Sequence, residues 1–89
     1  MIRIPNWDDL NGLALLCEEH AKYEGSDLKI REKEGLLGQH LFGDNPSLHC
    51  LVVELDRMLV GYATFAKQFS TWYADYYLYL DCLYLKAGA

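Results

Sequence analysis

The sequence predicts an α+β domain, with two helices followed by an antiparallel sheet of three to four strands, in the order β-α-α-β-β-β. Three observations lead to this prediction. Apolar residues recur at helical spacing between residues 7 and 42, strand-like runs fill residues 48–85, and turn residues separate neighbouring runs. Helices and strands that are segregated along a chain favour this fold class. With 89 residues, of which 52% are hydrophobic, residues 1–89 suit one domain.

The N-terminal part of the chain predicts a short strand and a long helix. The first four residues alternate apolar and polar, and Pro5 ends this strand because proline has no N–H for a ladder. Asn6 is a good N-cap, and residues 7–23 form an amphipathic helix that Gly25 ends. The apolar positions of this helix are Leu10, Leu13, Ala14, Cys17 and Ala21.

A second helix is expected before Gly43. Ser26 or Asp27 can cap it, and its charged run, residues 29–34, is interpreted as a solvated helix face. Residues 44–47 form a loop by composition. The apolar positions of the helix are Ile30, Leu37 and Leu41.

Three further strands are expected at residues 48–54, 58–67 and 76–85. Asp56-Arg57 predicts a tight connection, although it lacks the Asn-Gly or Asp-Gly signature of two-residue hairpins. Gly61 indicates a bulge or a close approach of another backbone. Residues 68–74, which include Trp72, are expected to form a loop.

The last expected strand contains a single carboxylate. Nine of the ten residues 76–85 are apolar or aromatic, and the exception is Asp81. A strand that is apolar on both faces is normally covered on both faces. A buried, unpaired carboxylate is costly, so Asp81 either has a partner or has a raised pKa that suits a general base. A paired or edge-exposed aspartate is an equal alternative.

Charge and composition restrict the partners and the compartment. The net charge of −5 argues against nucleic acid and anionic membranes as partners. No metal site is expected, because neither the histidines nor the cysteines show ligand spacing, and His20 is interpreted as a polar helix-edge residue. The start of the chain does not have the pattern of a signal peptide. We therefore expect a cytoplasmic protein with buried thiols.

Six short segments stand in an informative order. They are AKYE at 21–24, LFGDNP at 41–46, HCLVVE at 49–54, VGYA at 60–63, STW at 70–72 and YLDCLYL at 79–85. Together they resemble the opening of the GCN5-related N-acetyltransferases, and most closely the diamine (spermidine/spermine-type) branch. The resemblance covers nearly the whole chain in register.

The resemblance implies roles in the transfer of acetyl from acetyl-coenzyme A to a primary amine. Asp81 matches a strand glutamate that helps to handle the amine, and its side chain is one carbon shorter. Leu83 and Leu85 match positions whose backbone hydrogen-bonds the acetyl-pantetheine arm. Three further residues match substrate-pocket positions: Tyr23, Glu24 and Trp72. Two positions depart from the branch, because Cys82 and Ser70 stand where it has acids.

The resemblance also implies a second half that these residues do not include. In the family, the strand matching 76–85 is followed by an Arg/Gln-x-x-Gly-x-Gly loop that holds the pyrophosphate, by a fifth strand and by a tyrosine that acts as general acid. The fold is therefore expected to be a truncated one, with weak or absent acetyl-coenzyme A binding. An uncovered last strand exposes an apolar patch and a free edge, so we expect a homodimer joined through residues 76–85.

Three functions stay open. The first is an incomplete acetyltransferase that is inactive alone. The second is a dimeric, non-enzymatic module that binds a small cationic amine, since aromatic rings beside carboxylates attract organic cations. Its pocket residues would be Tyr23, Glu24, Trp72 and Asp81. The third is the product of a truncated gene that folds only because it dimerises.

Overall fold

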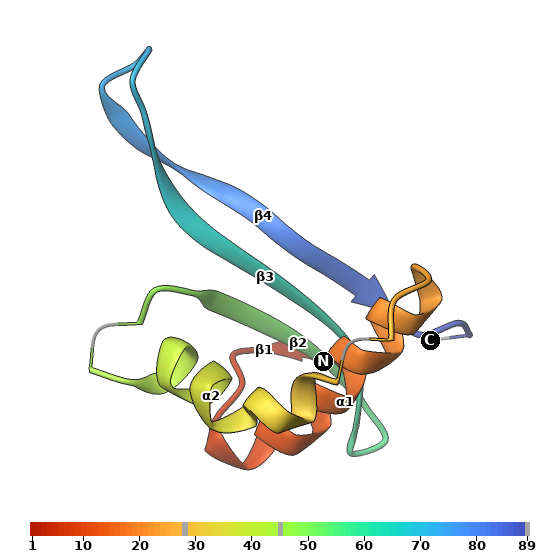
Figure 1. The fold of residues 1–89 in the computed structure, drawn as a ribbon. Helices are drawn as coiled ribbons and strands as arrows, with labels where there is room; N and C mark the ends of the chain where they lie inside the picture. Colours follow the sequence, from red (N-terminus) through yellow and green to blue (C-terminus); the bar gives the residue numbers. More distant parts are fainter. Residues whose placement is uncertain (28, 45, 89) are drawn as a thin grey trace.

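The helices lie together on one face of the sheet (Figure 1). In the computed structural model, the described residues, 1–27, 29–44 and 46–88, form two α-helices and a four-stranded antiparallel sheet. The strands lie in chain order and are β1 (Ile2–Arg3), β2 (His49–Leu55), β3 (Met58–Ser70) and β4 (Asp75–Leu85). The predicted α+β fold class is confirmed.

The first helix begins as the sequence predicts. A 3-10 turn, η1 (Trp7–Asp9), leads directly into α1 (Leu10–Tyr23). The side chain of Asn6 accepts a hydrogen bond from the Asp8 backbone N–H at 2.9 Å, and the Asp9 carboxylate accepts one from the Asn6 N–H at 2.8 Å. This reciprocal capping satisfies backbone donors that the first turn leaves free.

Arg3 joins β1 to the start of the helix and to β2. Its guanidinium donates to the two carboxylate oxygens of Asp9 at 2.7 and 2.8 Å and to the carboxylate of Glu54 at 2.7 Å. The hydrogen bonds from Arg3 are the main reason that the pKa of Asp9 lies below its ordinary value. This ion-pair network positions the N-terminal segment across the sheet edge.

The second helix, α2 (Glu34–Phe42), starts later than expected. The residue before it is Lys33, at the end of a 3-10 turn, η2 (Ile30–Lys33), so neither Ser26 nor Asp27 is the N-cap of α2. The nine α-helical residues include Leu37 and Leu41, which pack on the core, so packing rather than local capping sets the start.

The core lies between the helices and the sheet. Its buried cluster consists of Leu13, Leu16, Leu41, Cys50, Val52 and Tyr62. Cys82 and Tyr84 of β4 pack against this cluster, so they mark the helix-facing side of that strand. Because side chains alternate along a strand, the neighbouring residues face the opposite side, which we call the open face. Its β4 members include Leu83 and Leu85.

The connection between β2 and β3 is the tight turn that the sequence predicts. Asp56 and Arg57 both have positive φ, at 51° and 65°, which is typical of a type I′ turn even though neither residue is glycine. The expectations for Gly61 are also confirmed. A register shift lies opposite it between Val53 and Glu54, and a Cβ at position 61 would lie 2.9 Å from the Tyr84 carbonyl oxygen.

The hairpin of β3 and β4 is longer than predicted. Residues 68–70, which were expected to form a loop, pair with residues 75–77 of β4, and only four residues remain to make the turn. The hairpin rises well beyond the helices (Figure 1), and the long axis of the molecule measures 42 Å. Polar Gln68 and Ser70 resemble loop residues locally, but pairing with β4 keeps them extended.

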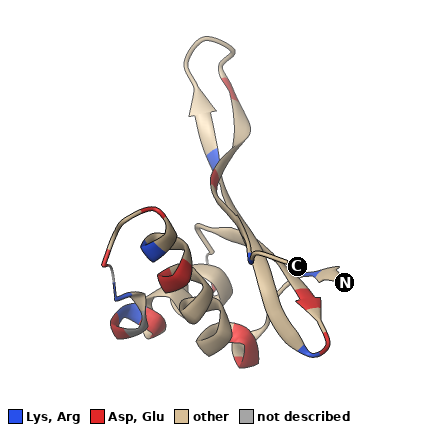
Figure 2. Ribbon diagram, turned by 90° about the vertical axis from the view of Figure 1, so that its right-hand side faces the viewer, with Lys and Arg blue, Asp and Glu red and all other residues tan. Residues whose placement is uncertain are grey.

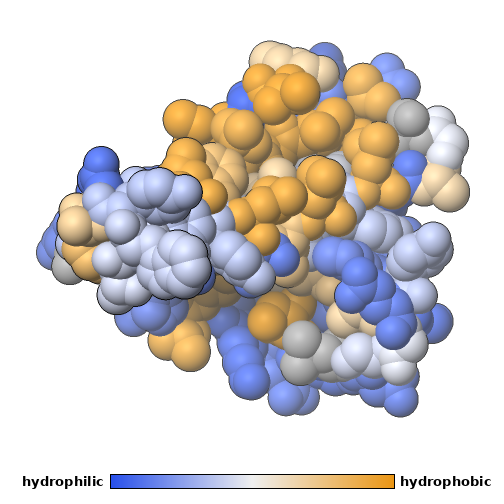
Figure 3. Space-filling view, turned by 90° about the horizontal axis from the view of Figure 1, so that it is seen from above, coloured by the Kyte–Doolittle hydropathy of each residue, from blue (hydrophilic) through white to orange (hydrophobic). Residues whose placement is uncertain are grey.

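The open face is strongly apolar. Seen from above, apolar side chains cover a broad part of the surface (Figure 3). Charged residues gather instead on the helices and near the β2–β3 turn, with few along the hairpin (Figure 2). The cover expected for a strand that is apolar on both sides is therefore absent from the described residues. None of the helices described is long and apolar enough to cross a membrane.

Candidate functional site

Asp81 lies at a β-bulge in β4. Thr64 of β3 pairs with Cys82 but the next residue, Phe65, pairs with Leu80, so Asp81 is the extra residue. Its carboxylate accepts from the Thr64 hydroxyl at 3.5 Å and from the Cys82 thiol at 3.6 Å. The Asp81 side chain is exposed. Of the two alternatives for this residue, the structure shows the paired, edge-exposed aspartate rather than a buried acid.

The backbone of β4 beyond the bulge faces the outside of the sheet. The Lys86 N–H donates to the Val60 carbonyl at 2.8 Å. Bonded and non-bonded residue pairs alternate along an antiparallel ladder, and the register of β3 with β4 stays regular from Cys82 to Leu85. Leu83 and Leu85 are therefore non-bonded positions, whose N–H and C=O groups point to the edge of β4 that no described strand covers.

The end of α1 lies against the helix-facing side of β4. The ring of Tyr23 lies 6.3 Å from the ring of Tyr84, and His20 stacks on Tyr84 at 4.9 Å. Glu24 reaches the same group, because its carboxylate lies 3.2 Å from Nε2 of His20. The structure thus brings Tyr23 and Glu24 to the strand that carries Asp81.

His20 is the residue whose position the sequence did not reveal. Its Nδ1 lies 2.7 Å from the hydroxyl of Tyr62, which is only 3% exposed. A buried tyrosine hydroxyl needs a hydrogen-bond partner. The sequence does not show this need, because it does not show that the Tyr62 side chain faces the helix. His20 is thus a half-buried, polar residue in the last turn of α1, and the sequence did not show its partner.

Two thiols complete this polar layer beneath the sheet. Cys17 of α1 and Cys82 of β4 pack against the core cluster that includes Tyr62, and burial is the main reason that the pKa values of all three groups lie above their ordinary values. Since Cys82 also donates to Asp81, side-chain contacts run from Glu24 through His20 and Tyr62 to the bulge. These protonated thiols act as weak hydrogen-bonding groups rather than as nucleophiles.

Trp72 stands apart from the other predicted site residues. It lies in the turn at the tip of the hairpin and is 93% exposed. Asp81 lies six positions after Asp75 in β4, which corresponds to about 20 Å of extended chain. Within one chain, the four residues expected to form an amine pocket do not converge, because Trp72 is remote from Tyr23, Glu24 and Asp81.

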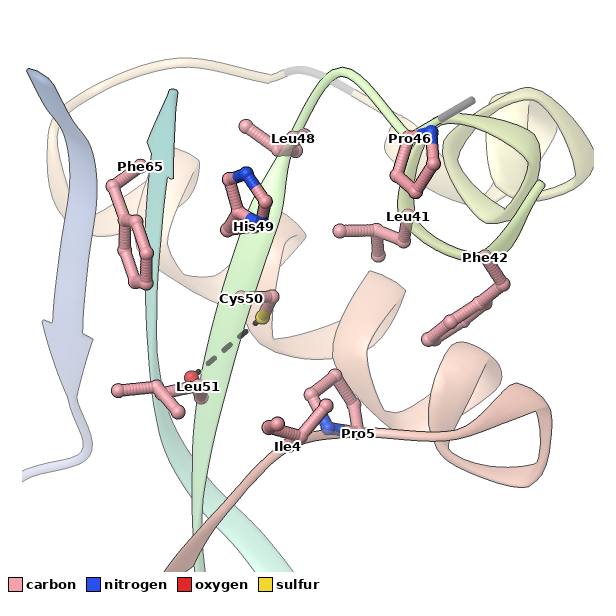
Figure 4. Close-up of a pocket in the computed structure, with 10 residues that line it drawn as sticks. All are labelled: Ile4, Pro5, Leu41, Phe42, Pro46, Leu48, His49, Cys50, Leu51 and Phe65. Atoms are coloured by element: carbon pink, nitrogen blue, oxygen red, sulfur yellow. Dashed lines mark hydrogen bonds between the residues drawn. The ribbon is translucent and has the colours of Figure 1, made fainter. Parts of the chain in front are cut away.

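A separate apolar hollow lies between β2 and α2, away from β4. It has a volume of about 220 Å³ and opens beside β2 where the two residues of β1 no longer cover that strand. Figure 4 shows Leu41 and Phe42 of α2 on one side and His49 and Phe65 on the other. His49 stacks on Phe65 at 5.7 Å. None of the predicted site residues lines this hollow.

Solved structures define the class of fold. The chain superimposes on a possible acetyltransferase from Clostridium difficile 630 with a TM-score of 0.79 and 22% identity, over 98% of this chain and 57% of that one. A probable acetyltransferase gives a TM-score of 0.80 and 20% identity over 100% of this chain and 59% of the other. The fold is that of an acetyltransferase of the GCN5-related type, and the β-α-α-β-β-β order fits the first half of it.

Curated sequences agree with this class. The chain is 30% identical to thialysine N-epsilon-acetyltransferase from Sus scrofa and 31% identical to the Bos taurus protein, in each case over 97% of this chain and 55% of the relative. It therefore spans about half the length of the curated relatives it matches. No protein-family model matches the chain. The chain is therefore similar to acetyltransferases in both sequence and fold, which agrees with the resemblance of its short segments.

Proposed function

We propose that these residues form the amine-facing half of an N-acetyltransferase, which transfers acetyl from acetyl-coenzyme A to a primary amine. The 89 residues contain no Arg/Gln-x-x-Gly-x-Gly segment to hold the pyrophosphate. On this proposal the chain is inactive alone, and activity requires a further segment, in the same or another polypeptide, that supplies this loop.

The observation that supports this proposal most is the outward backbone of Leu83 and Leu85. A strand edge with free N–H and C=O groups can pair with an extended amide chain, as it would with another strand. The pantetheine arm of coenzyme A is such a chain. An N–H group directed at the thioester carbonyl would also stabilise the negative charge that forms there when the amine attacks.

Asp81 is suited to the amine side of the reaction. It lies at the bulge two residues before Leu83, and its exposed carboxylate can hold a substrate ammonium next to the acyl arm. The amine must lose a proton before its nitrogen attacks the thioester carbon, and a carboxylate can accept that proton. As the amide bond forms, the bond from carbon to sulfur breaks and the coenzyme A thiolate takes up a proton. Glu24 adds a second exposed carboxylate at the end of α1.

The relatives suggest the substrate for a direct test. They are named for acetylating thialysine at its ε-nitrogen, so thialysine is a reasonable first amine. We expect residues 1–89 alone to show no low-micromolar binding of acetyl-coenzyme A by calorimetry. Adding a polypeptide that corresponds to the unmatched part of the Sus scrofa relative should produce coenzyme A in a thiol-release assay.

Two variants make this experiment specific. Asp81→Asn keeps the shape of the side chain but removes the carboxylate, so it should lower turnover in the reconstituted pair. Leu36→Lys, at an exposed position on α2, should leave turnover unchanged. Tight binding by residues 1–89 alone, or equal turnover with Asp81→Asn, would contradict the proposal.

A second function is a dimeric binding module for a small cationic amine. It is favoured by the fact that Tyr23, Glu24 and Asp81 are exposed at α1 and β4 without any further segment. If it is correct, spermidine should raise the melting temperature of residues 1–89, and Asp81→Asn should abolish this shift. An equal shift with both proteins would indicate general ionic binding to an acidic chain instead.

A further inference from the structure

We propose that His20 is a positioning residue, which orients the Glu24 carboxylate for the substrate amine by joining it to the buried hydroxyl of Tyr62. His20 lies in the last turn of α1, and Glu24 is the C-cap of that helix. Nδ1 of the imidazole lies 2.7 Å from the Tyr62 hydroxyl, and Nε2 lies 3.2 Å from the Glu24 carboxylate. This inference rests on the proposed function, because it names the residue that orients an amine-binding group of that site.

Glu24 needs such a contact to keep one orientation. It lies at the C-terminal end of α1, where the helix dipole disfavours a negative charge. Its side chain is 67% exposed, and an exposed glutamate loses rotamer entropy when one conformation is selected. The His20 side chain is only 13% exposed and offers the carboxylate an ordered donor. The orientation of Glu24 is therefore set by His20 rather than by the helix.

The His20 ring is itself held by β3 and β4. It stacks on the ring of Tyr84 of β4, with the centroids 4.9 Å apart and an angle of 18° between the planes. Tyr62 of β3 supplies the second contact. Burial raises the pKa of Tyr62, so its hydroxyl keeps its proton and acts as a donor. A ring that is stacked on one strand and bonded to the next has a fixed orientation relative to the sheet.

The two partners determine which nitrogen of His20 carries the proton. A carboxylate only accepts hydrogen bonds, so Nε2 must carry a hydrogen to bond Glu24. In the neutral ring, Nδ1 is then the acceptor for the Tyr62 hydroxyl. Every donor in this chain of contacts faces an acceptor, from the buried tyrosine to the exposed carboxylate. The opposite tautomer would leave Glu24 without a donor and the Tyr62 hydroxyl without an acceptor at Nδ1.

This arrangement directs Glu24 to the amine side of the proposed site. The ring of Tyr23 lies 6.3 Å from the ring of Tyr84, and both belong to the group around His20. Tyr84 lies three positions after Asp81 in β4, which corresponds to about 10 Å of extended chain. An ammonium held by Glu24 would lie beside aromatic rings, whose faces attract cations. His20 acts through Glu24 rather than on the reacting atoms, so we expect it to affect amine binding and not the rate of acetyl transfer.

Two substitutions separate the two contacts of His20. Asparagine places its amide near the position of Nδ1, so His20→Asn can still accept from Tyr62 but does not reach Glu24. Glutamine places its amide near the position of Nε2, so His20→Gln can still donate to Glu24. In the reconstituted pair, His20→Asn should raise the KM for thialysine by about two- to tenfold, which is the usual effect of one hydrogen bond, and should leave kcat unchanged. His20→Gln should keep a KM close to that of the wild type.

Stability should follow the opposite order. His20→Asn keeps an acceptor for the buried Tyr62 hydroxyl and His20→Gln removes it, so the urea midpoint should be higher for the asparagine variant. A merely structural role would instead lower the stability and raise the KM in the same variant. His40→Asn is the matched control, because His40 is exposed in the last turn of α2 and contacts Ser47. It should leave the KM unchanged, and a KM that rises as much as in His20→Asn would overturn the proposal.

NMR correlation of the ring nitrogens with the ring protons tests the contacts without turnover. At about pH 8, where an ordinary imidazole is neutral, His20 in residues 1–89 should show a single tautomer with its proton on Nε2. Glu24→Ala should return the mixture of tautomers that a free imidazole shows. A mixture in the wild type would overturn the proposal, and so would equal KM values for the wild type and His20→Asn.

Absence of turnover in every reconstituted pair would contradict the acetyltransferase proposal, and amine binding then decides the role of His20. In that case spermidine should raise the melting temperature of residues 1–89 less in His20→Asn than in His20→Gln. Equal shifts in the two variants would overturn the positioning role.

Discussion

Replacing Gly61 with alanine tests the close packing of β3 against the end of β4. A Cβ at this position would lie 2.6 Å from Cδ1 of Leu85 and 2.9 Å from the Tyr84 carbonyl oxygen. The Leu85 side chain can rotate because it is exposed, but the Tyr84 carbonyl belongs to the ladder and can move only with the strand. Overpacking of this kind costs about 1–3 kcal/mol.

A smaller effect of opposite sign offsets part of this cost. Alanine in a strand is favoured over glycine by about 0.5–1 kcal/mol, because glycine loses more conformational freedom on folding. The net expectation for Gly61→Ala is therefore a loss of about 0–2.5 kcal/mol in the free energy of unfolding. Gly35→Ala is the matched control, since a Cβ there meets nothing within 4 Å and the residue lies in α2. It should stabilise the protein by up to about 1 kcal/mol.

Urea unfolding followed by circular dichroism measures both effects. The measurement is made at a low protein concentration, because any association would add to the apparent stability. Gly61→Ala and Gly35→Ala should then shift the unfolding midpoint in opposite directions. If both substitutions stabilise the protein, β3 and β4 are not as close at Tyr84 as the structure shows, and the reasoning fails.

Three further predictions concern the polar contacts. Tyr62→Phe removes the partner of His20 Nδ1 and should lower the free energy of unfolding in urea by about 1–3 kcal/mol. The loss should be smaller when His20→Leu is already present, and additive losses would contradict the contact. The pKa of Asp9 is lower in the folded than in the unfolded state, so its contribution to stability is full above about pH 4 and is lost as the pH falls through the folded value. Arg3→Met should therefore flatten the acid limb of a stability–pH profile, and an unchanged limb would refute this. Burial raises the pKa of the Cys50 thiol to about 12, so this residue should resist alkylation at pH 8 until urea unfolds the chain, as mass spectrometry of the labelled peptide would show.

Local signals in the sequence were sufficient for several elements. Asn6 indicates the start of the first helix, because a short polar side chain can cap backbone N–H groups. The structure contains the reciprocal hydrogen bonds of this cap with Asp9. Gly61 indicates a close approach because only glycine leaves room for the Tyr84 carbonyl. These features depend on one residue and its near neighbours, so their physical meaning can be interpreted without the fold.

Features that depend on distant partners could not be obtained in this way. The bulge at Asp81 exists only in the register of β4 with β3, and nothing in the run of residues 76–85 shows which residue is extra. His20 gains its role from Tyr62, which lies 42 residues away. Trp72 was grouped with Asp81 by resemblance, but the unexpected length of the hairpin places it at the tip.

The edge and the open face of β4 bear on both the proposed acyl arm and the homodimer that the sequence predicts. The proposed acyl arm would use the N–H and C=O groups of Leu83 and Leu85, whereas the second copy would use the side chains of the same residues. Side chains and backbone groups of a strand point in perpendicular directions, so face-to-face packing leaves these hydrogen-bonding groups available. Pairing of two β4 edges would instead occupy the same backbone groups and compete with the arm.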